Sequence, residues 1–184
     1  YEILGGFYNW LYRPDIPMVC VGHQYLFFHS EFQFPSKGKM DRFFVIFNSR
    51  LTALRAKRLL ALSFDELIDQ PSRQVYVVSP LLRRDIHSLT ASQKEYILVY
   101  LNHPALYSQI FEWHKQHPHV VLHCFWSKSD ALEEEKIDET LTLHRLDGAK
   151  FLEMMADCKA LVTTAGFESV CEARYLDKPV MVVP

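Results

Sequence analysis

Lys159-Ala-Leu-Val-Thr-Thr-Ala-Gly-Phe-Glu-Ser-Val-Cys-Glu-Ala-Arg-Tyr-Leu-Asp-Lys-Pro-Val-Met-Val-Val-Pro184 is the stretch that decides the fold. The apolar run 160–162 predicts a buried strand, and the small residues 163–166 predict a tight turn. Residues 167–175 favour a helix, and 180–183 a second buried strand. The stretch therefore predicts a βαβ unit with its turn at the carboxyl end of a parallel strand.

The turn in this unit has the composition of an anion site. Open α/β sheets bind ligands beyond the carboxyl ends of their strands. Backbone N–H groups at a helix N-terminus lack intrahelical acceptors and suit an anion. Gly166 adds no side chain there, and Thr164 and Ser169 add only hydroxyl groups. We therefore expect phosphate as the ligand.

The same alternation extends back to Glu95. Strands alternating with helices are typical of a doubly wound parallel sheet, so the predicted fold class is α/β, with Rossmann-like domains. The expected strands are 96–101, 120–125 and 140–143, and the expected helices are 105–116 and 149–157. The charged segment 128–136 is predicted to be a helix or a loop.

The front of the chain predicts a second domain. A helix over 2–12 ends before Pro14, and further elements are expected at 17–21 (strand), 40–54 (helix), 61–64 and 75–78 (strands). The segment from Ser79 to Asp85 lacks periodicity and opens with a proline, which indicates a boundary. We therefore expect two domains, 1–80 and 81–184, both of them incomplete.

Charge differs between the two halves of the chain. Residues 1–84 carry 11 Lys and Arg against 7 Asp and Glu, a net +4, whereas residues 85–184 carry 9 against 15, a net −6. The basic residues of the first half interleave with aromatic ones along the helix expected at 40–54. An anionic membrane surface would suit that pattern. A core helix with a solvated basic face is the favoured alternative.

The composition of the chain bears on whether it spans a membrane and on the compartment in which it is found. No segment approaches the roughly 20 apolar residues of a membrane-spanning helix. The four cysteines include no C-x-x-C pair, which indicates free thiols in a reducing, cytoplasmic compartment. The sequence begins at Tyr1 without an initiator methionine and ends at Pro184 directly after a strand. We therefore expect an internal piece of a longer protein.

Several chemistries lack their motifs. G-x-G-x-x-G, a P-loop, G-x-S-x-G and an Asp-x-Asp pair are all absent from the sequence, so dinucleotide, nucleotide-triphosphatase and hydrolase-elbow sites lose support. Four histidines lie between residues 114 and 123, but they span a helix end and a strand start. Metal ligands must converge, so exposed or capping histidines are favoured over a metal site.

Further candidate residues lie near the predicted turn. Glu172 follows Gly166 by six residues, about one and a half helical turns. Its carboxylate suits a vicinal diol such as a ribose, and an exposed helical glutamate is the simpler alternative. The loops at Asn102-His103 and at Leu146 are expected at the same sheet edge, where they would form a ligand crevice. His23-Gln24 follows a buried strand, as a functional pair or as an ordinary turn.

The residues also resemble a known family. Ile97-Leu-Val-Tyr-Leu101, Asp157-Cys-Lys-Ala160, Thr163-Thr-Ala-Gly-Phe-Glu-Ser-Val-Cys-Glu-Ala173 and Lys178-Pro-Val-Met-Val-Val-Pro184 are similar to GT-B nucleotide-sugar glycosyltransferases. Within these the subgroup related to MurG is nearest, which adds N-acetylglucosamine to a lipid-linked precursor. The run from Asp157 to Pro184 is the most specific part. Ile16-Pro17 through His23-Gln24 resembles a strand and loop late in the N-terminal domain of that group.

The resemblance implies a role for each domain. Residues 1–80 would end an N-terminal acceptor domain, and 81–184 would form most of the domain that binds the nucleotide-sugar donor. Donor contacts would come from the residues at the turn and the two nearby loops, namely Asn102, His103, Leu146, Thr164, Gly166, Phe167, Ser169 and Glu172. His23 and Gln24 would face the acceptor.

The implied reaction is an inverting, metal-independent transfer of a hexose or N-acetylhexosamine from a uridine diphosphate sugar. The donor is a substrate, and no cofactor and no nucleic acid are expected. The acceptor would be a glycan, a lipid-linked or a small molecule, with peripheral membrane contact as an option. The catalytic base is expected before Tyr1, so this piece alone is expected to be inactive. Alternatives are an epimerase or hydrolase of the same fold and a non-catalytic nucleotide-sugar-binding module.

Overall fold

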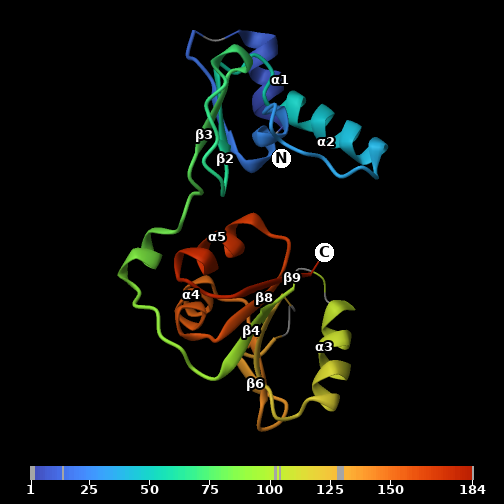
Figure 1. Ribbon diagram of the computed structural model, residues 1–184, viewed down its shortest axis with the longest axis vertical. Coiled ribbons are helices and arrows are strands. Elements are labelled where there is room, and N and C mark those ends of the chain that lie inside the picture. The colour runs from blue at the N-terminus through green and yellow to red at the C-terminus, as the bar shows by residue number, and fades with distance from the viewer. Residues whose placement is uncertain (1–2, 14, 102, 104, 128–130, 184) are drawn as a thin grey trace. The chain divides into compact units, whose positions relative to one another are not determined.

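The computed structural model describes residues 3–13, 15–101, 103, 105–127 and 131–183. The chain divides into two compact units, residues 1–81 and 82–184 (Figure 1). The boundary predicted from the sequence followed residue 80. Each unit has its own sheet and its own buried core.

The first unit is a three-stranded parallel sheet with two α-helices. The strands have the order β1-β2-β3. The elements are α1 (Ile3–Tyr12), β1 (Val19–Gly22), the 3-10 helix η1 (His23–Phe28), α2 (Lys39–Thr52), β2 (Arg58–Leu62), η2 (Pro71–Arg73) and β3 (Val75–Val78). The strand predicted at 61–64 was placed three residues too late. Pairing explains the shift, because Arg58 lies opposite Val19 of β1 and the strand must begin there.

Helices α1 and α2 pack through small residues. A Cβ atom on Gly6 of α1 would lie 2.1 Å from the carbonyl oxygen of Leu51 in α2, so only glycine permits this approach. The buried positions of α2 are Ser49 and Thr52. Thr52 shares a hydrogen bond of 3.1 Å with the hydroxyl of Tyr25. The fully buried residues of α2 are therefore small and polar, and its large apolar residues are exposed or only partly buried.

The second unit is a six-stranded sheet in the order β6-β7-β5-β4-β8-β9. Apart from β6, its neighbouring strands are parallel. Its elements are η3 (Arg84–Ser88), β4 (Tyr96–Tyr100), α3 (Ala105–Gln116), β5 (Val121–Trp126), β6 (Glu134–Lys136), β7 (Leu141–Arg145), α4 (Gly148–Asp157), β8 (Ala160–Thr164), α5 (Phe167–Tyr175) and β9 (Val180–Val183). In chain order the five parallel strands run 3-2-1-4-5, which is the Rossmann order. The order in which successive strands are added reverses between β4 and β8, and this is called the reversal point below.

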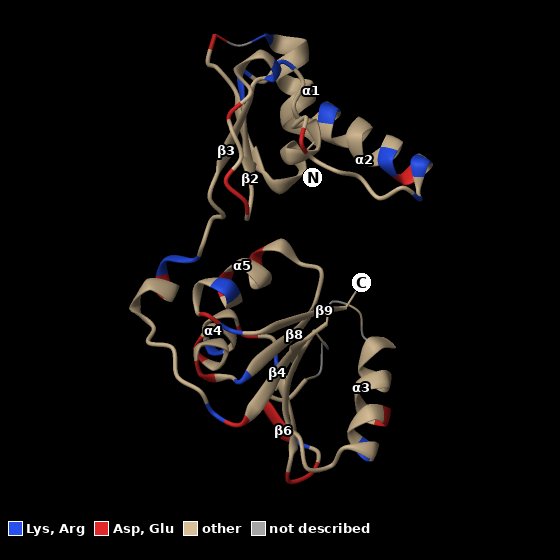
Figure 2. Cartoon of the chain, in the orientation of Figure 1, with Lys and Arg blue, Asp and Glu red and all other residues tan. Residues whose placement is uncertain are grey.

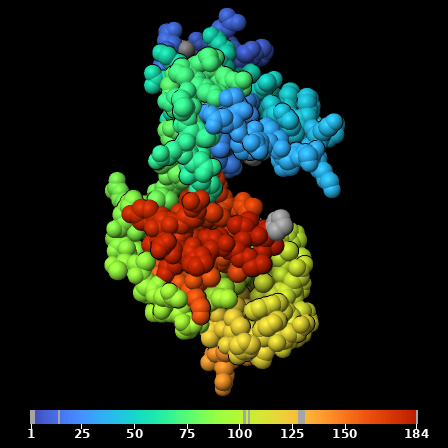
Figure 3. All heavy atoms as spheres, viewed as in Figure 1, coloured from blue at the N-terminus to red at the C-terminus, as the bar shows by residue number. Residues whose placement is uncertain are grey.

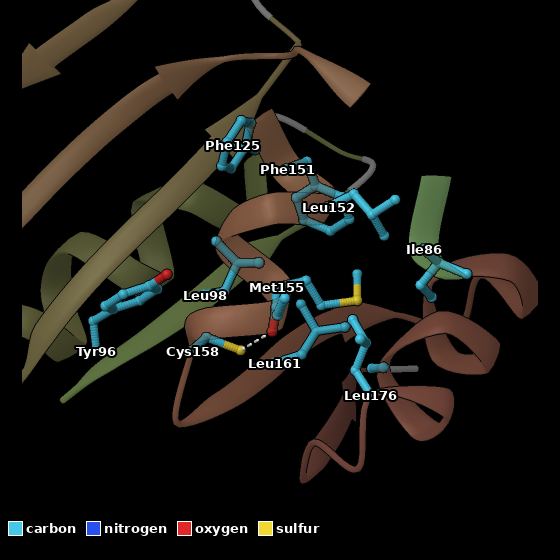
Figure 4. Close-up of a cluster of buried hydrophobic side chains, with 12 residues drawn as sticks. Ile86, Tyr96, Leu98, Phe125, Phe151, Leu152, Met155, Cys158, Leu161 and Leu176 are labelled. Carbon is cyan, nitrogen blue, oxygen red and sulfur yellow. Dashed lines mark hydrogen bonds between the residues drawn. The ribbon is translucent and has the colours of Figure 1, made fainter. Parts of the chain in front are cut away.

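Helices cover both faces of this sheet (Figure 1). On one face, α4 and α5 enclose a core that includes Leu98, Phe125, Phe151, Met155 and Leu161 (Figure 4). On the other face, α3 packs on Val99, Cys124 and Leu143, among others. In Figure 3 the C-terminal residues, coloured red, form one continuous patch on the face shown. Residues of β4, β5, β8 and β9 contribute to both cores, as expected for a sheet buried on both sides.

The charged segment 128–136 was predicted to be a helix or a loop, and this prediction is wrong for residues 134–136. Residues 134–136 form the edge strand β6, antiparallel to β7, so the sheet is mixed rather than wholly parallel. Residues 128–130 lie outside the described part. Charged side chains are common on edge strands because they discourage pairing with other chains. Because residues 134–136 are all charged, they lack the apolar alternation by which a strand is recognised in sequence.

Candidate functional site

The reversal point of the second sheet places two predicted loops side by side. Tyr100 at the end of β4 lies opposite Thr163 of β8, so the chain leaves both strands at the same edge. Asn102, in the first of these loops, lies outside the described residues. His103 is exposed, and its Nδ1 accepts a hydrogen bond of 3.2 Å from the backbone N–H of Ala105 at the start of α3.

Two of the helices that begin at this edge, α4 and α5, differ in how their N-termini are capped. Helix α4 is capped by Asp147, whose Oδ1 accepts from the N–H groups of Ala149 and Lys150, both at 2.9 Å. Helix α5 begins after Gly166, which provides no side-chain cap. A capping carboxylate occupies the position that a bound anion would take. Of these two helices, only α5 therefore lacks a capping carboxylate at this position.

Gly166 is not required by the fold. Its backbone lies at φ −77° and ψ 123°, a region open to any residue. A Cβ atom there would meet Ser169 Oγ at 3.5 Å and the Thr164 carbonyl oxygen at 3.8 Å, which are ordinary contacts. Steric need within the protein therefore does not explain a glycine at this position, whereas close approach of a ligand to the backbone would.

Hydroxyl groups line the same turn. Thr163 is buried, and its Oγ1 lies 3.4 Å from Ser169 Oγ. Ser169 Oγ also contacts the carbonyl oxygen of Gly166 at 3.4 Å. Thr164 ends β8 and Phe167 opens α5, and both are partly buried. The structure thus brings the predicted residues Thr164, Gly166, Phe167 and Ser169 together around one helix start.

Glu172 has a partner that the sequence did not suggest. Its side chain is only 4% exposed, and both carboxylate oxygens accept hydrogen bonds from Arg83. The distances are 2.6 Å from Nε to Oε1 and 2.7 Å from Nη2 to Oε2. The hydrogen bond with Glu172 also raises the pKa of the Arg83 guanidinium. The simpler alternative of an exposed helical glutamate is therefore wrong, and the ribose role stays a prediction.

Arg83 also ties a third segment to this pair. Its Nη1 donates a 2.7 Å hydrogen bond to the carbonyl oxygen of Gly148, the first residue of α4. Leu146, two residues earlier and directly after β7, is 46% exposed. The predicted loop at Leu146 is thus connected to Glu172 through Arg83. The sequence offered one hint of Arg83, a pair of arginines in a segment without periodicity.

His23 and Gln24 lie in the first unit, directly after β1. His23 is exposed and Gln24 is half-buried. The side chain of Gln24 folds over Gly22, where a Cβ atom would lie 2.3 Å from Gln24 Oε1. Gly22 therefore allows the glutamine to lie back against the strand end.

The histidines have structural partners rather than a common ligand. His114 is buried and contacts Asp138, so the expectation of an exposed or capping residue is wrong for it. His123 Nδ1 lies 2.8 Å from Nε2 of the buried His144. Burial lowers the pKa of His123 and lowers that of His144 to about 4, so the pair is neutral at pH 7. Among the described residues, no three metal-binding side chains converge.

Tyr107 of α3 fastens the carboxyl ends of two strands. Its hydroxyl donates to the carbonyl oxygen of Phe125 at the end of β5. It also accepts a 3.2 Å hydrogen bond from the N–H of Leu101, directly after β4. The side chain is buried, and burial raises the pKa of this phenol. This edge of the sheet is therefore anchored to α3.

Comparisons with known proteins agree with this arrangement. The family model described as glycosyl transferase family 1 matches residues 5–184, which is nearly the whole chain. The chain matches no curated protein and no solved structure. In the described part of the chain, no helix is long and apolar enough to cross a membrane. With its Rossmann-type strand order and the uncapped helix at the reversal point, the chain belongs to glycosyl transferase family 1 and has the GT-B, Rossmann-like fold.

Proposed function

We propose that this protein transfers a hexose or an N-acetylhexosamine from a uridine diphosphate sugar to an acceptor hydroxyl. The family supports glycosyl transfer, and the donor, the sugar and the stereochemistry are proposals. The observation that carries the donor site is the uncapped start of α5 at the reversal point of the sheet, beside the capped start of α4. A doubly wound sheet binds nucleotides at this point.

In the proposed donor site, different residues bind the diphosphate, the ribose and the base of the donor. The diphosphate approaches Gly166 and contacts the turn formed with Thr164, Phe167 and Ser169. The ribose diol is bound by Glu172. The base lies near Leu146, and the loop of Asn102 and His103 borders the diphosphate. His23 and Gln24 are proposed acceptor-side residues of the first unit.

The proposed transfer inverts the anomeric carbon. The acceptor oxygen forms a bond to that carbon as its bond to the diphosphate oxygen breaks, and the acceptor proton passes to a base that we leave unassigned. The electron pair departs with the diphosphate. The N-terminal dipole of α5 and its N–H donors stabilise this charge, the role that a metal ion has in other transferases. We propose a metal-independent reaction on this basis.

Glu172→Ala tests the donor site. We expect uridine diphosphate binding to weaken by about 1–3 kcal/mol, the usual cost of leaving polar groups unpaired. Calorimetry of the variant and the unaltered protein measures the difference, and unchanged affinity would remove Glu172 from the site. Product analysis tests the reaction: transfer to an acceptor supports it. A free or an epimerised sugar would instead indicate a hydrolase or an epimerase, and binding without turnover a non-catalytic module.

We also propose that α2 contacts an anionic membrane surface. Met40, Phe43, Phe44 and Phe47 are 66%, 59%, 53% and 48% exposed. Phe43 and Phe47 stack with centroids 6.0 Å apart. Lys39, Arg42 and Arg50 line one shallow surface pocket with Phe43 and Phe47. Basic positions, blue in Figure 2, occur at both ends of α2. An apolar face with basic flanks suits a helix that lies in the headgroup region.

Vesicle sedimentation tests this contact. Phe43→Ser combined with Phe47→Ser should abolish binding to vesicles rich in anionic lipid, and Ile137→Ser, an exposed apolar residue of the second unit, should leave it intact. Equal binding to neutral vesicles would contradict the role of the basic residues. If the double variant instead abolished self-association, the face would be an interface between copies.

The four buried free thiols support a reducing compartment, and we propose the cytoplasm.

A further inference from the structure

Arg83 and Glu172 form a fork-to-fork pair. Nε and Nη2 of the guanidinium donate to Oε1 and Oε2 of the carboxylate at 2.6 Å and 2.7 Å. This geometry fixes the plane of the carboxylate as well as its charge, because two parallel hydrogen bonds leave it little rotation. The two residues are 89 positions apart in sequence.

The exposure of the pair is unequal. The side chain of Glu172 is 4% exposed, and that of Arg83 is 40% exposed. A buried carboxylate without a partner takes up a proton or moves toward water. The position and orientation of the Glu172 carboxylate therefore depend on Arg83.

Arg83 is held in turn by the start of α4. Its Nη1 donates to the carbonyl oxygen of Gly148 at 2.7 Å. A Cβ atom on Gly148 would lie 3.2 Å from this nitrogen, so the absence of a side chain leaves room for the guanidinium. Three of the five guanidinium N–H groups of Arg83 thus donate hydrogen bonds, two of them to Glu172 and one to the carbonyl oxygen of Gly148.

A carboxylate has about four acceptor positions, and the guanidinium occupies two of them. We infer that Arg83 is a positioning residue, which holds the Glu172 carboxylate so that its remaining acceptor positions bind the vicinal diol of the donor ribose. This inference rests on the proposed function, and it adds selectivity for a ribose over a sugar that lacks the hydroxyl pair. Arg83 acts through Glu172 and is not assigned a contact with the ligand.

Binding of uridine diphosphate and of 2′,3′-dideoxyuridine diphosphate tests the inference, because the two differ only in the diol. Calorimetry of the unaltered protein should show roughly 10- to 100-fold tighter binding of the ribose form, as hydrogen bonds to a charged group imply. Arg83→Met should reduce this ratio to below about threefold, while the affinity for the dideoxy form changes little. Arg84→Met is the matched control, because Arg84 is an exposed neighbour with the same charge, and it should keep the full ratio.

Arg83→Lys guards against a folding failure of the methionine variant. Lysine keeps the charge and cannot form the two parallel hydrogen bonds. It should therefore fold and still lose most of the ratio. A full ratio in Arg83→Lys or Arg83→Met would overturn the inference. A larger ratio would also overturn it, since Arg83 would then be blocking the diol.

Two further results separate this inference from the proposed function. If the unaltered protein binds both nucleotides equally, the ribose site at Glu172 fails, and the positioning role fails with it. If Arg83→Met weakens both nucleotides equally and Arg84→Met does not, the donor site stands. Arg83 would then act on the whole site rather than on the diol, and the inference would be wrong.

Discussion

Gly166→Ala separates a ligand role of this glycine from a structural one. The effect on stability should be small, because two contributions oppose each other. Replacing glycine at a compatible position restricts the unfolded chain and stabilises by about 0.4–1 kcal/mol. Alanine is a poorer N-cap than glycine, which costs about 0.5–1 kcal/mol. The free energy of unfolding should therefore change by less than about 0.5 kcal/mol, since the added Cβ meets no atom closer than 3.5 Å.

Ligand binding should change far more. A methyl group at this position would stand between the diphosphate and the backbone at the start of α5. Loss of one hydrogen bond to a charged group weakens binding by about 1.5–3 kcal/mol, roughly 10- to 100-fold in Kd. Calorimetry with uridine diphosphate measures this loss, and urea unfolding measures stability. Uridine is the control ligand, because it lacks phosphate and should lose little affinity.

Two results would refute the reasoning. Uridine diphosphate affinity within about threefold of the unaltered protein would show that the diphosphate does not approach Gly166. A fall of more than about 2 kcal/mol in the free energy of unfolding would show that the glycine is needed by the fold itself. The first result would remove the donor site from α5, and the second would leave it unsupported by this residue.

Two further predictions concern stability. Because burial lowers the pKa of His144 to about 4, the unfolded chain binds the extra proton as pH falls below about 6.5. The free energy of unfolding should therefore fall by up to about 3 kcal/mol between about pH 6.5 and pH 4. His144→Leu should flatten this dependence in urea titrations, whereas a variant of the exposed His119 should not; equal slopes in both would contradict the assignment. Asp147→Ala should cost about 0.5–2 kcal/mol through loss of the two cap bonds of α4, measured by urea unfolding. A loss below about 0.3 kcal/mol would mean that water replaces the cap.

Local sequence patterns predicted most of the helices and strands of the second unit. The bounds of α3 and α5 agree with the predicted residues, because each helix has its own apolar spacing and a clear stop. The same holds for β9, a short apolar run after a proline. The turn at Gly166 was also recognisable, since small residues between a strand and a helix have few other uses. Elements whose signal lies within a few residues were therefore predicted well.

Contacts between distant residues were not predictable in this way. Glu172 was recognised as a candidate, but its burial and its pairing with Arg83 depend on a contact across 89 positions. The pair of His123 and His144 depends on the register of β5 with β7, which no single segment encodes. Strand β6 was missed because its side chains are charged and its pairing is settled only by the neighbouring strand.

The hydroxyl of Tyr107 shields the backbone directly after β4 from solvent. An amide directly after a strand normally exchanges its hydrogen through local fraying. The N–H of Leu101 instead donates to a phenol that is buried beneath α3 and bonded to the end of β5. Its exchange requires α3 to leave the sheet, so this loop begins from a fixed point. The end of β4 is therefore expected to stay in register with β5.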